Sequence, residues 1–210
     1  MITLTESQND ALTEVCNIGM SKAAKQLSIL LKDEIDMHVP HVEIIPAELA
    51  ADQLGIKKDQ RVICVQQSID GALGGEALLF FHDEDSASLI NSLLGDLANY
   101  APITEKREFE HEAMMEIGNI IISACLGTLA NFLKEEIILS VPRYSENTAE
   151  SIISINIAEL ESPDKKTALM AITTILEASN RDVTGTLIIM YTLKSIQHLI
   201  ALIDDMIDVR

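Results

Sequence analysis

The chain carries one pattern twice, and this repetition strongly limits the folds open to it. Four residues recur 102 positions later with every internal spacing kept: Asp10, Glu14, Asn17 and Pro40, then Glu112, Glu116, Asn119 and Pro142. Further positions are identical at the same offset: Ile18/Ile120, Ser21/Ser123, Leu27/Leu129, Leu31/Leu133, Lys32/Lys134, Glu34/Glu136, Ile35/Ile137 and Val39/Val141. Such gapless identity predicts a duplicated unit with two equivalent sites.

Each copy opens with the pattern of a long helix. Thr5 followed by Gln8 is a capping box, which predicts a helix over about residues 6–31, and Thr104 is placed to begin its counterpart. Apolar residues recur at helical spacing in the first copy at Leu12, Val15, Cys16, Gly19, Met20, Ala23, Leu27 and Leu30. In the second copy they are Met114, Ile117, Ile121, Ala124, Cys125, Leu129 and Phe132. Both stripes predict buried faces.

Shorter segments follow each helix. Five β-branched or apolar runs are predicted as strands: Arg61–Gln66, Glu76–His82, Ser151–Ile157, Ala168–Leu176 and Thr186–Thr192. Hairpin turns are expected at Gly71, Gly74 and Gly75 and over Asn180–Gly185, and closing helices over Glu84–Leu94 and Lys194–Ile207.

These elements predict an α+β fold with pseudo-twofold symmetry, in which an antiparallel sheet packs with two long motif-bearing helices. We expect residues 1–210 to form one domain of two repeats, about 1–100 and 101–210, joined over Asp96–Thr104.

Composition narrows the function. With 210 residues, 48% of them hydrophobic, the chain can bury a core without metal or disulfide support. A net charge of -18 argues against nucleic-acid partners, which are held through clustered Lys and Arg. Cys16, Cys64 and Cys125 have no CxxC spacing and are predicted to be reduced core thiols. No signal-peptide pattern or uninterrupted apolar run of spanning length occurs, so a cytoplasmic protein without membrane insertion is expected.

The repeated polar residues form a stripe along each helix. Positions i, i+4, i+7 and i+11 share one side, so Asp10, Glu14, Asn17 and Ser21 are neighbours there. A solvated polar face is the ordinary explanation for such a stripe, but recurrence of the pair with its distant proline favours function. Asparagine is a mediocre helix former, so its mid-helix position points either to tertiary hydrogen bonding or to a presented amide.

The doubled spacing Asp-x3-Glu-x2-Asn-x22-Pro resembles the signature of the CheC–CheX–FliY phosphatases of chemotaxis, and the likeness spans nearly the whole chain. It implies a CheC-like fold and hydrolysis of the aspartyl phosphate on the response regulator CheY. Asn17 and Asn119 would orient the attacking water, Glu14 and Glu116 would pair with the regulator's lysine, and Asp10 and Glu112 would support them. Pro40 and Pro142 would shape the chain that follows. Glu112 departs from the Asp or Ser usual at its position.

The resemblance also implies partners and cofactors. The chain would need no cofactor of its own, because the phosphorylated receiver supplies the acceptor aspartate and Mg²⁺. The deamidase CheD is a further partner of the family. The alternative function is a non-catalytic adaptor of the chemotaxis or flagellar switch system that binds a receiver or CheD.

Other candidate sites are weaker. His38 and His41 have HxxH spacing but flank Pro40 in a stretch predicted to be extended, so no metal site is expected there. The run His82–Asp85 is typical of a solvated helix start. His111, beside the second motif, is expected on a solvated face. Lys22, Lys25 and Lys32 are candidates for recognising a phosphorylated partner.

Overall fold

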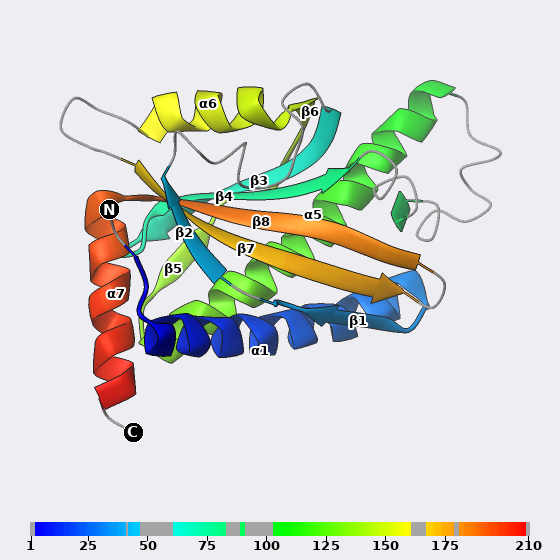
Figure 1. Cartoon of the computed structure of the whole chain (residues 1–210). Helices are drawn as coiled ribbons and strands as arrows, with labels where there is room; N and C mark the ends of the chain where they lie inside the picture. Colours follow the sequence, from blue (N-terminus) through cyan, green and yellow to red (C-terminus); the bar gives the residue numbers. More distant parts are fainter. Residues whose placement is uncertain are drawn as a thin grey trace.

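The computed structural model describes residues 3–40, 42–46, 61–82, 89–90, 103–160, 167–178 and 181–208 (Figure 1). Its strands form one eight-stranded sheet in which every pairing is antiparallel. They are β1 (Ile35–His38), β2 (Val42–Pro46), β3 (Arg61–Gly71), β4 (Gly75–His82), β5 (Ile137–Leu139), β6 (Arg143–Thr148), β7 (Thr167–Ala178) and β8 (Arg181–Thr192). The order is β1-β7-β8-β4-β3-β5, with β2 also on β7 and β6 also on β3, so the long central strands come from both halves of the sequence.

Helices cover the sheet on two faces (Figure 1). The larger core lies between one face and the helices α1 (Glu6–Leu31), α5 (Ile103–Leu133) and α7 (Leu193–Asp208). A smaller core lies between the other face and α6 (Ala149–Leu160). This arrangement follows from the strands, whose alternating side chains serve both cores: Ile63 and Val65 face the first, Val62 and Cys64 the second.

The two halves are related as the repeat predicts. Lys32 and Lys134 both follow a motif helix in the left-handed conformation, with φ of 53° and 58°. The strands that follow begin at the equivalent residues Ile35 and Ile137. The predicted α+β fold, with two long motif-bearing helices on an antiparallel sheet, is confirmed.

The first helix begins as its sequence predicts. The Thr5 hydroxyl accepts a hydrogen bond from the Gln8 amide, and the Gln8 side chain accepts one from the Thr5 amide. The predicted apolar stripe is buried from Leu12 to Leu27, although Leu30 is only half-buried. Helix α5 starts at Ile103, one residue before Thr104, and Phe132 at the end of its stripe is exposed.

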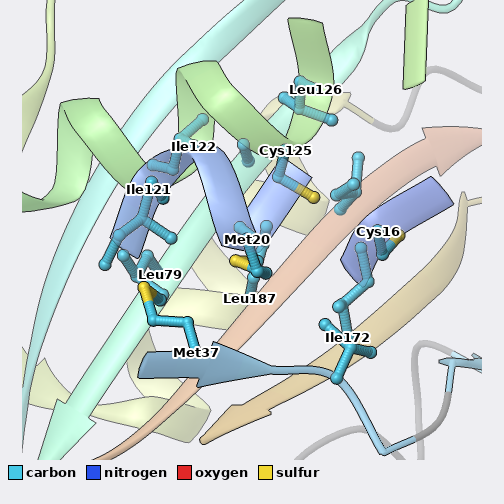
Figure 2. Packing of buried hydrophobic residues seen from close by; sticks show 14 of the residues in the cluster. Cys16, Met20, Met37, Leu79, Ile121, Ile122, Cys125, Leu126, Ile172 and Leu187 are labelled. Carbon is cyan, nitrogen blue, oxygen red and sulfur yellow. The ribbon is translucent and has the colours of Figure 1, made fainter. Parts of the chain in front are cut away.

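The motif helices touch closely where they cross (Figure 2). A Cβ atom at Gly19 would lie 2.8 Å from the Cα of Cys125 and 3.0 Å from the Ala124 carbonyl oxygen. In α5, Gly118 allows a similarly close approach to the sheet, since a Cβ there would lie 2.5 Å from Cγ1 of Val65 in β3. Small residues thus set how near α5 lies to both α1 and β3.

Several sequence predictions are wrong. Ser151–Ile157, predicted as a strand, lies in α6, because Thr148 caps the helix by accepting from the Ser151 amide and Ile152, Ile153 and Asn156 bury one face. Arg181–Gly185, predicted as part of a turn, belongs to β8, which pairs with β7 up to Ala178 and Arg181. Strands β2 and β6 were not predicted, the latter because an edge strand of polar sequence shows no apolar alternation.

Other predictions are confirmed or fall outside the described residues. The glycine turn joins β3 to β4, and Lys194–Ile207 is helical within α7. Of the predicted helix Glu84–Leu94, Leu89 and Ile90 are helical and buried, and its other residues lie outside the described part of the chain. Of the predicted junction, Ile103 and Thr104 lie in α5 and 96–102 lie outside it.

Helix α5 alone, among the described helices, is long and apolar enough over Lys106–Leu133 to cross a membrane. Within the fold, 61% of its most apolar window is buried, as expected of a core helix. Its apolar character is therefore explained by the packing that the structure shows.

Candidate functional site

The first motif lies along α1 on the side away from the core. Asp10, Glu14 and Ser21 are exposed, and Asn17 is half-buried. The Ser21 hydroxyl donates to the backbone carbonyl of Asn17 at 2.9 Å, the bond to the carbonyl four residues earlier that serine can form within a helix. The carboxylates of Asp10 and Glu14 are therefore within reach of a partner, as predicted.

The Asn17 carboxamide is bound at both ends to a single residue. Its Oδ1 accepts from the Val39 amide at 2.7 Å, and its Nδ2 donates to the Val39 carbonyl at 3.0 Å. Val39 is 2% exposed and lies directly after β1, between His38 and Pro40. This explains the spacing between asparagine and proline, because the residue before the proline must lie where its backbone N–H and carbonyl can both bond the asparagine side chain.

The second motif has the same placement on α5, with a different set of contacts. Glu112 and Glu116 are exposed and Asn119 is half-buried. Asn119 Oδ1 accepts from the Ser123 hydroxyl at 3.2 Å and from Gln67 Nε2 at 3.2 Å. Among the described residues, no partner contacts its Nδ2 by hydrogen bonding.

Sequence reasoning missed Gln67. This β3 residue is 1% exposed, and its Nε2 also donates to the Ser140 carbonyl at 2.7 Å. Its Oε1 is buried without a hydrogen-bond partner in the structure as described. The signal was available: Ile63, Val65 and Ile69 alternate on the core-facing side of β3, and a glutamine interrupts that series.

The segment that follows each motif helix also differs. Val141, the counterpart of Val39, is 82% exposed. Its carbonyl accepts from the Ser140 hydroxyl at 3.1 Å, and that hydroxyl also accepts from the Ser68 amide at 2.9 Å. Pro142 follows as Pro40 follows Val39, so the predicted supporting prolines occupy equivalent places beside non-equivalent hydrogen-bond networks.

A cavity of about 330 Å³ adjoins the first motif. Asp10 and Glu14 of α1 line one side of this cavity, and Phe132 of α5 and Met206 of α7 form an apolar wall. A carboxylate next to an apolar wall suits a lysine or arginine, whose stem is apolar and whose head is charged. A larger hollow of about 1030 Å³ lies by the β3–β4 turn and the start of α7, but no predicted site residue lines it.

The remaining candidate residues have mostly structural surroundings. His111 is half-buried and stacks on Tyr144 with ring centroids 4.0 Å apart, so the face predicted to be solvated is partly covered at this residue. Lys22 Nζ donates to Thr128 Oγ1 at 3.0 Å, which ties α1 to α5. His38 is half-buried at the end of β1, while His41 lies outside the described residues. No group of three or more metal-ligating side chains is found within the described ranges.

The three cysteines are buried and free, as predicted of core thiols. A hydrogen bond with Cys16, together with burial, raises the pKa of Cys125, and burial raises the pKa of Cys64 well above its ordinary value. Neutral buried thiols are poor nucleophiles. The Glu and Asn residues of the two motifs stay the candidate functional groups on these helices.

Comparisons with known proteins find relatives of this chain among CheC-like proteins. A model of the CheC-like family matches residues 8–44, which contain the whole first motif. The chain is 27% identical over 178 residues to the CheY-P phosphatase CheC of Bacillus subtilis, covering 85% of this chain and 84% of that protein. It is 24% identical over 140 residues to the flagellar motor switch phosphatase FliY of the same organism, covering 67% of this chain but only 36% of FliY.

A solved structure supports the fold. The FliY of Thermotoga maritima superposes with a TM-score of 0.73 at 17% identity, covering 98% of this chain and all of that one. Fold and motif together define a chain built on a duplicated CheC-like architecture. In sequence it resembles the CheC-like family and the CheY-P phosphatase CheC, and in fold it resembles FliY.

Proposed function

We propose that this protein hydrolyses the aspartyl phosphate of a CheY-type receiver domain. The observation that carries the proposal is the Glu-Asn pair repeated at equivalent positions of α1 and α5, with both carboxylates exposed on the helices' outer sides. The name of the related CheY-P phosphatase CheC supplies the substrate class. Because one sheet takes strands from both repeats, we propose that residues 1–210 act as a single domain.

The reaction needs positioning more than covalent chemistry. A water oxygen attacks phosphorus, the bond between phosphorus and the receiver's carboxylate oxygen breaks, and aspartate and inorganic phosphate are formed. Protons of the water pass to the phosphate or to solvent. A carboxamide cannot serve as a practical base, but it can hold this water in line with the phosphoryl group.

Each motif residue then has a defined part. Asn17 and Asn119 orient the attacking water, and Glu14 and Glu116 pair with the receiver's lysine. The cavity beside Glu14 fits this pairing, because its apolar wall can hold the stem of a lysine. Asp10 and Glu112, one turn earlier, extend the acidic surface of each helix.

The remaining parts of the proposal concern what the receiver brings. Mg²⁺ is expected to be bound by the receiver's own acidic residues, so this chain contributes the asparagine and the acidic surface. CheD stays a predicted further partner. A cytoplasmic location, where a receiver would be met, and the absence of nucleic-acid partners remain predictions from composition.

One observation favours the alternative, a non-catalytic adaptor that binds a receiver or CheD. The Asn17 carboxamide has both ends engaged by Val39, as a structural asparagine would. Hydrolysis at the first site therefore requires Asn17 to exchange these bonds for contacts with water and phosphate.

Decay of a radiolabelled phosphorylated receiver from the same genome distinguishes the two functions. The enzyme accelerates decay when it is present at well below the receiver's concentration, whereas an adaptor cannot turn over. Replacing both asparagines, Asn17→Ala with Asn119→Ala, should slow the catalysed decay at least about a hundredfold and leave receiver binding largely intact. Unaltered decay with the wild-type protein would eliminate phosphatase activity toward that receiver.

A further inference from the structure

The two asparagines occupy equivalent positions of the repeat but differ in their hydrogen bonds. Asn17 has both its acceptor and its donor engaged by the Val39 backbone. Asn119 has its acceptor engaged twice, by Gln67 and Ser123, and its donor unbound among the described residues. Both ends of the Asn17 carboxamide are therefore engaged, whereas the Asn119 carboxamide presents an N–H group that no described residue accepts.

Hydrogen-bond chemistry fixes the direction of the Asn119 amide. The Ser140 carbonyl can only accept, so the atom of Gln67 that lies 2.7 Å from it must be Nε2. Nε2 can only donate, so the Asn119 atom 3.2 Å away must be Oδ1. The Nδ2 of Asn119 is consequently the end that points away from Gln67.

We propose that Gln67 is a positioning residue of the second site, which holds Asn119 with its Nδ2 donor free for the phosphoryl group or the attacking water. The inference rests on the proposed phosphatase function and goes beyond it, because it makes the two sites unequal. A water that accepts from Nδ2 keeps a second lone pair for attack on phosphorus. The second site is therefore ready to act, whereas the first must open.

Packing brings Gln67 within reach of Asn119. Gly118 allows α5 to lie against Val65, and Gln67 is two residues further along the same face of β3. The buried Oε1 of Gln67 has no partner in the described part of the chain, an arrangement that costs stability. An apolar residue would avoid that cost, so the glutamine is better explained by its two donated bonds.

Sequence differences between the repeats explain why the Nδ2 group of Asn17 is bound and that of Asn119 has no partner among the described residues. The registers of β1 on β7 and of β5 on β3 place Thr174 at the strand position that corresponds to Gln67, and threonine has no carboxamide. Ser140 stands where the first repeat has His38, and its hydroxyl donates to the Val141 carbonyl. That carbonyl is the counterpart of the one that binds Asn17 Nδ2.

Two kinetic results are expected. Asn119→Ala should lower kcat at least about tenfold more than Asn17→Ala does, since opening the first site breaks two hydrogen bonds. In an Asn17→Ala background, Gln67→Met should lower kcat at least about tenfold and change KM for the phosphorylated receiver less than about twofold. Gln66→Met is the matched control, because this neighbouring glutamine lies on the opposite face of β3, and it should leave both constants unchanged.

A measurement independent of activity keeps the inference testable should Gln67→Met fold poorly or the receiver prove not to be a substrate. In wild-type protein, NMR should show the Nδ2 protons of Asn17 protected from solvent exchange and those of Asn119 exchanging at least about tenfold faster. Gln67→Met should shift the Asn119 side-chain amide resonances and leave those of Asn17 in place.

The outcomes separate the two proposals. No accelerated decay with wild type refutes the phosphatase function, and the NMR result then still decides whether Gln67 orients Asn119. Accelerated decay with equal losses from the two asparagine variants, or with Gln67→Met behaving like Gln66→Met, overturns the positioning role. Equal protection of the two amides overturns the asymmetry on which it is based.

Discussion

Replacing Gly118 by alanine tests the close packing that places Asn119 beside Gln67. The new Cβ would lie 2.5, 2.6 and 2.8 Å from three side-chain atoms of Val65, which is fully buried in β3. Overpacking of this kind costs typically about 1–3 kcal/mol. Alanine gains about 1 kcal/mol over glycine in a helix interior, so a net loss of about 1 kcal/mol in the free energy of unfolding is expected.

Gly127→Ala is the matched control. Gly127 is in the same helix, and a Cβ added there would meet no other atom within 4 Å. Here the helix propensity acts alone, and the free energy of unfolding should rise by about 1 kcal/mol. Urea unfolding followed by circular dichroism measures both variants, and the expected difference between them is about 2 kcal/mol.

A combined variant isolates the cause. Val65→Ala removes two of the three atoms that the new methyl group meets, Cγ1 and Cγ2, so Gly118→Ala should cost less in that background, with a coupling of about 1 kcal/mol. The reasoning is refuted if Gly118→Ala stabilises the protein as much as Gly127→Ala does, because α5 and β3 would then not be in the tight contact described.

Two further predictions concern pH and helix capping. Burial raises the pKa of Cys64 and Tyr191, and the hydrogen bond with Cys16 raises that of Cys125, so above about pH 8.5 the unfolded chain releases protons that the folded chain keeps. The free energy of unfolding should therefore fall as pH rises from 8 to 10, by up to about 1.4 kcal/mol per pH unit for each group past its unfolded pKa. Cys64→Val removes one of these groups, so its urea midpoint should fall less steeply with rising pH than that of the wild-type protein. Thr5→Ala removes the cap of α1 and should lower the free energy of unfolding by about 1 kcal/mol in the same assay; an unaltered midpoint would contradict the capping role.

Local sequence signals predicted the start of a helix well where the sequence contains recognisable capping residues. The capping box at Thr5 predicted the start of α1, and Thr104, predicted to begin the second motif helix, lies one residue after the first residue of α5. The error at α6 has a physical cause: its isoleucines favour strands locally, but the Thr148 cap and burial against the sheet determine the outcome. Polar edge strands such as β6 carry no apolar alternation and are settled by pairing with β3.

The site was predictable only in part. Spacing singled out Glu14, Asn17, Glu116 and Asn119 as candidates, because a repeated polar stripe on a helix can be read without tertiary structure. The partners of the two asparagines could not be found in this way. Gln67 lies 52 residues from Asn119, and their contact depends on how a strand of the first repeat lies beneath a helix of the second.

Duplication accounts for both the likeness and the difference of the two sites. Asn17 is held within its own repeat, by the Val39 backbone directly after β1, whereas Asn119 takes a partner from the other repeat, Gln67 of β3, the strand that pairs with β5. A substitution in β3 therefore alters the environment of α5 without touching that of α1. In such a fold, two related helices can keep the same Glu-Asn spacing while the segments around them engage both ends of one carboxamide and, among the described residues, only the oxygen of the other. The asymmetry thus arises from the strands, and a search for site residues confined to the motif helices would not find it.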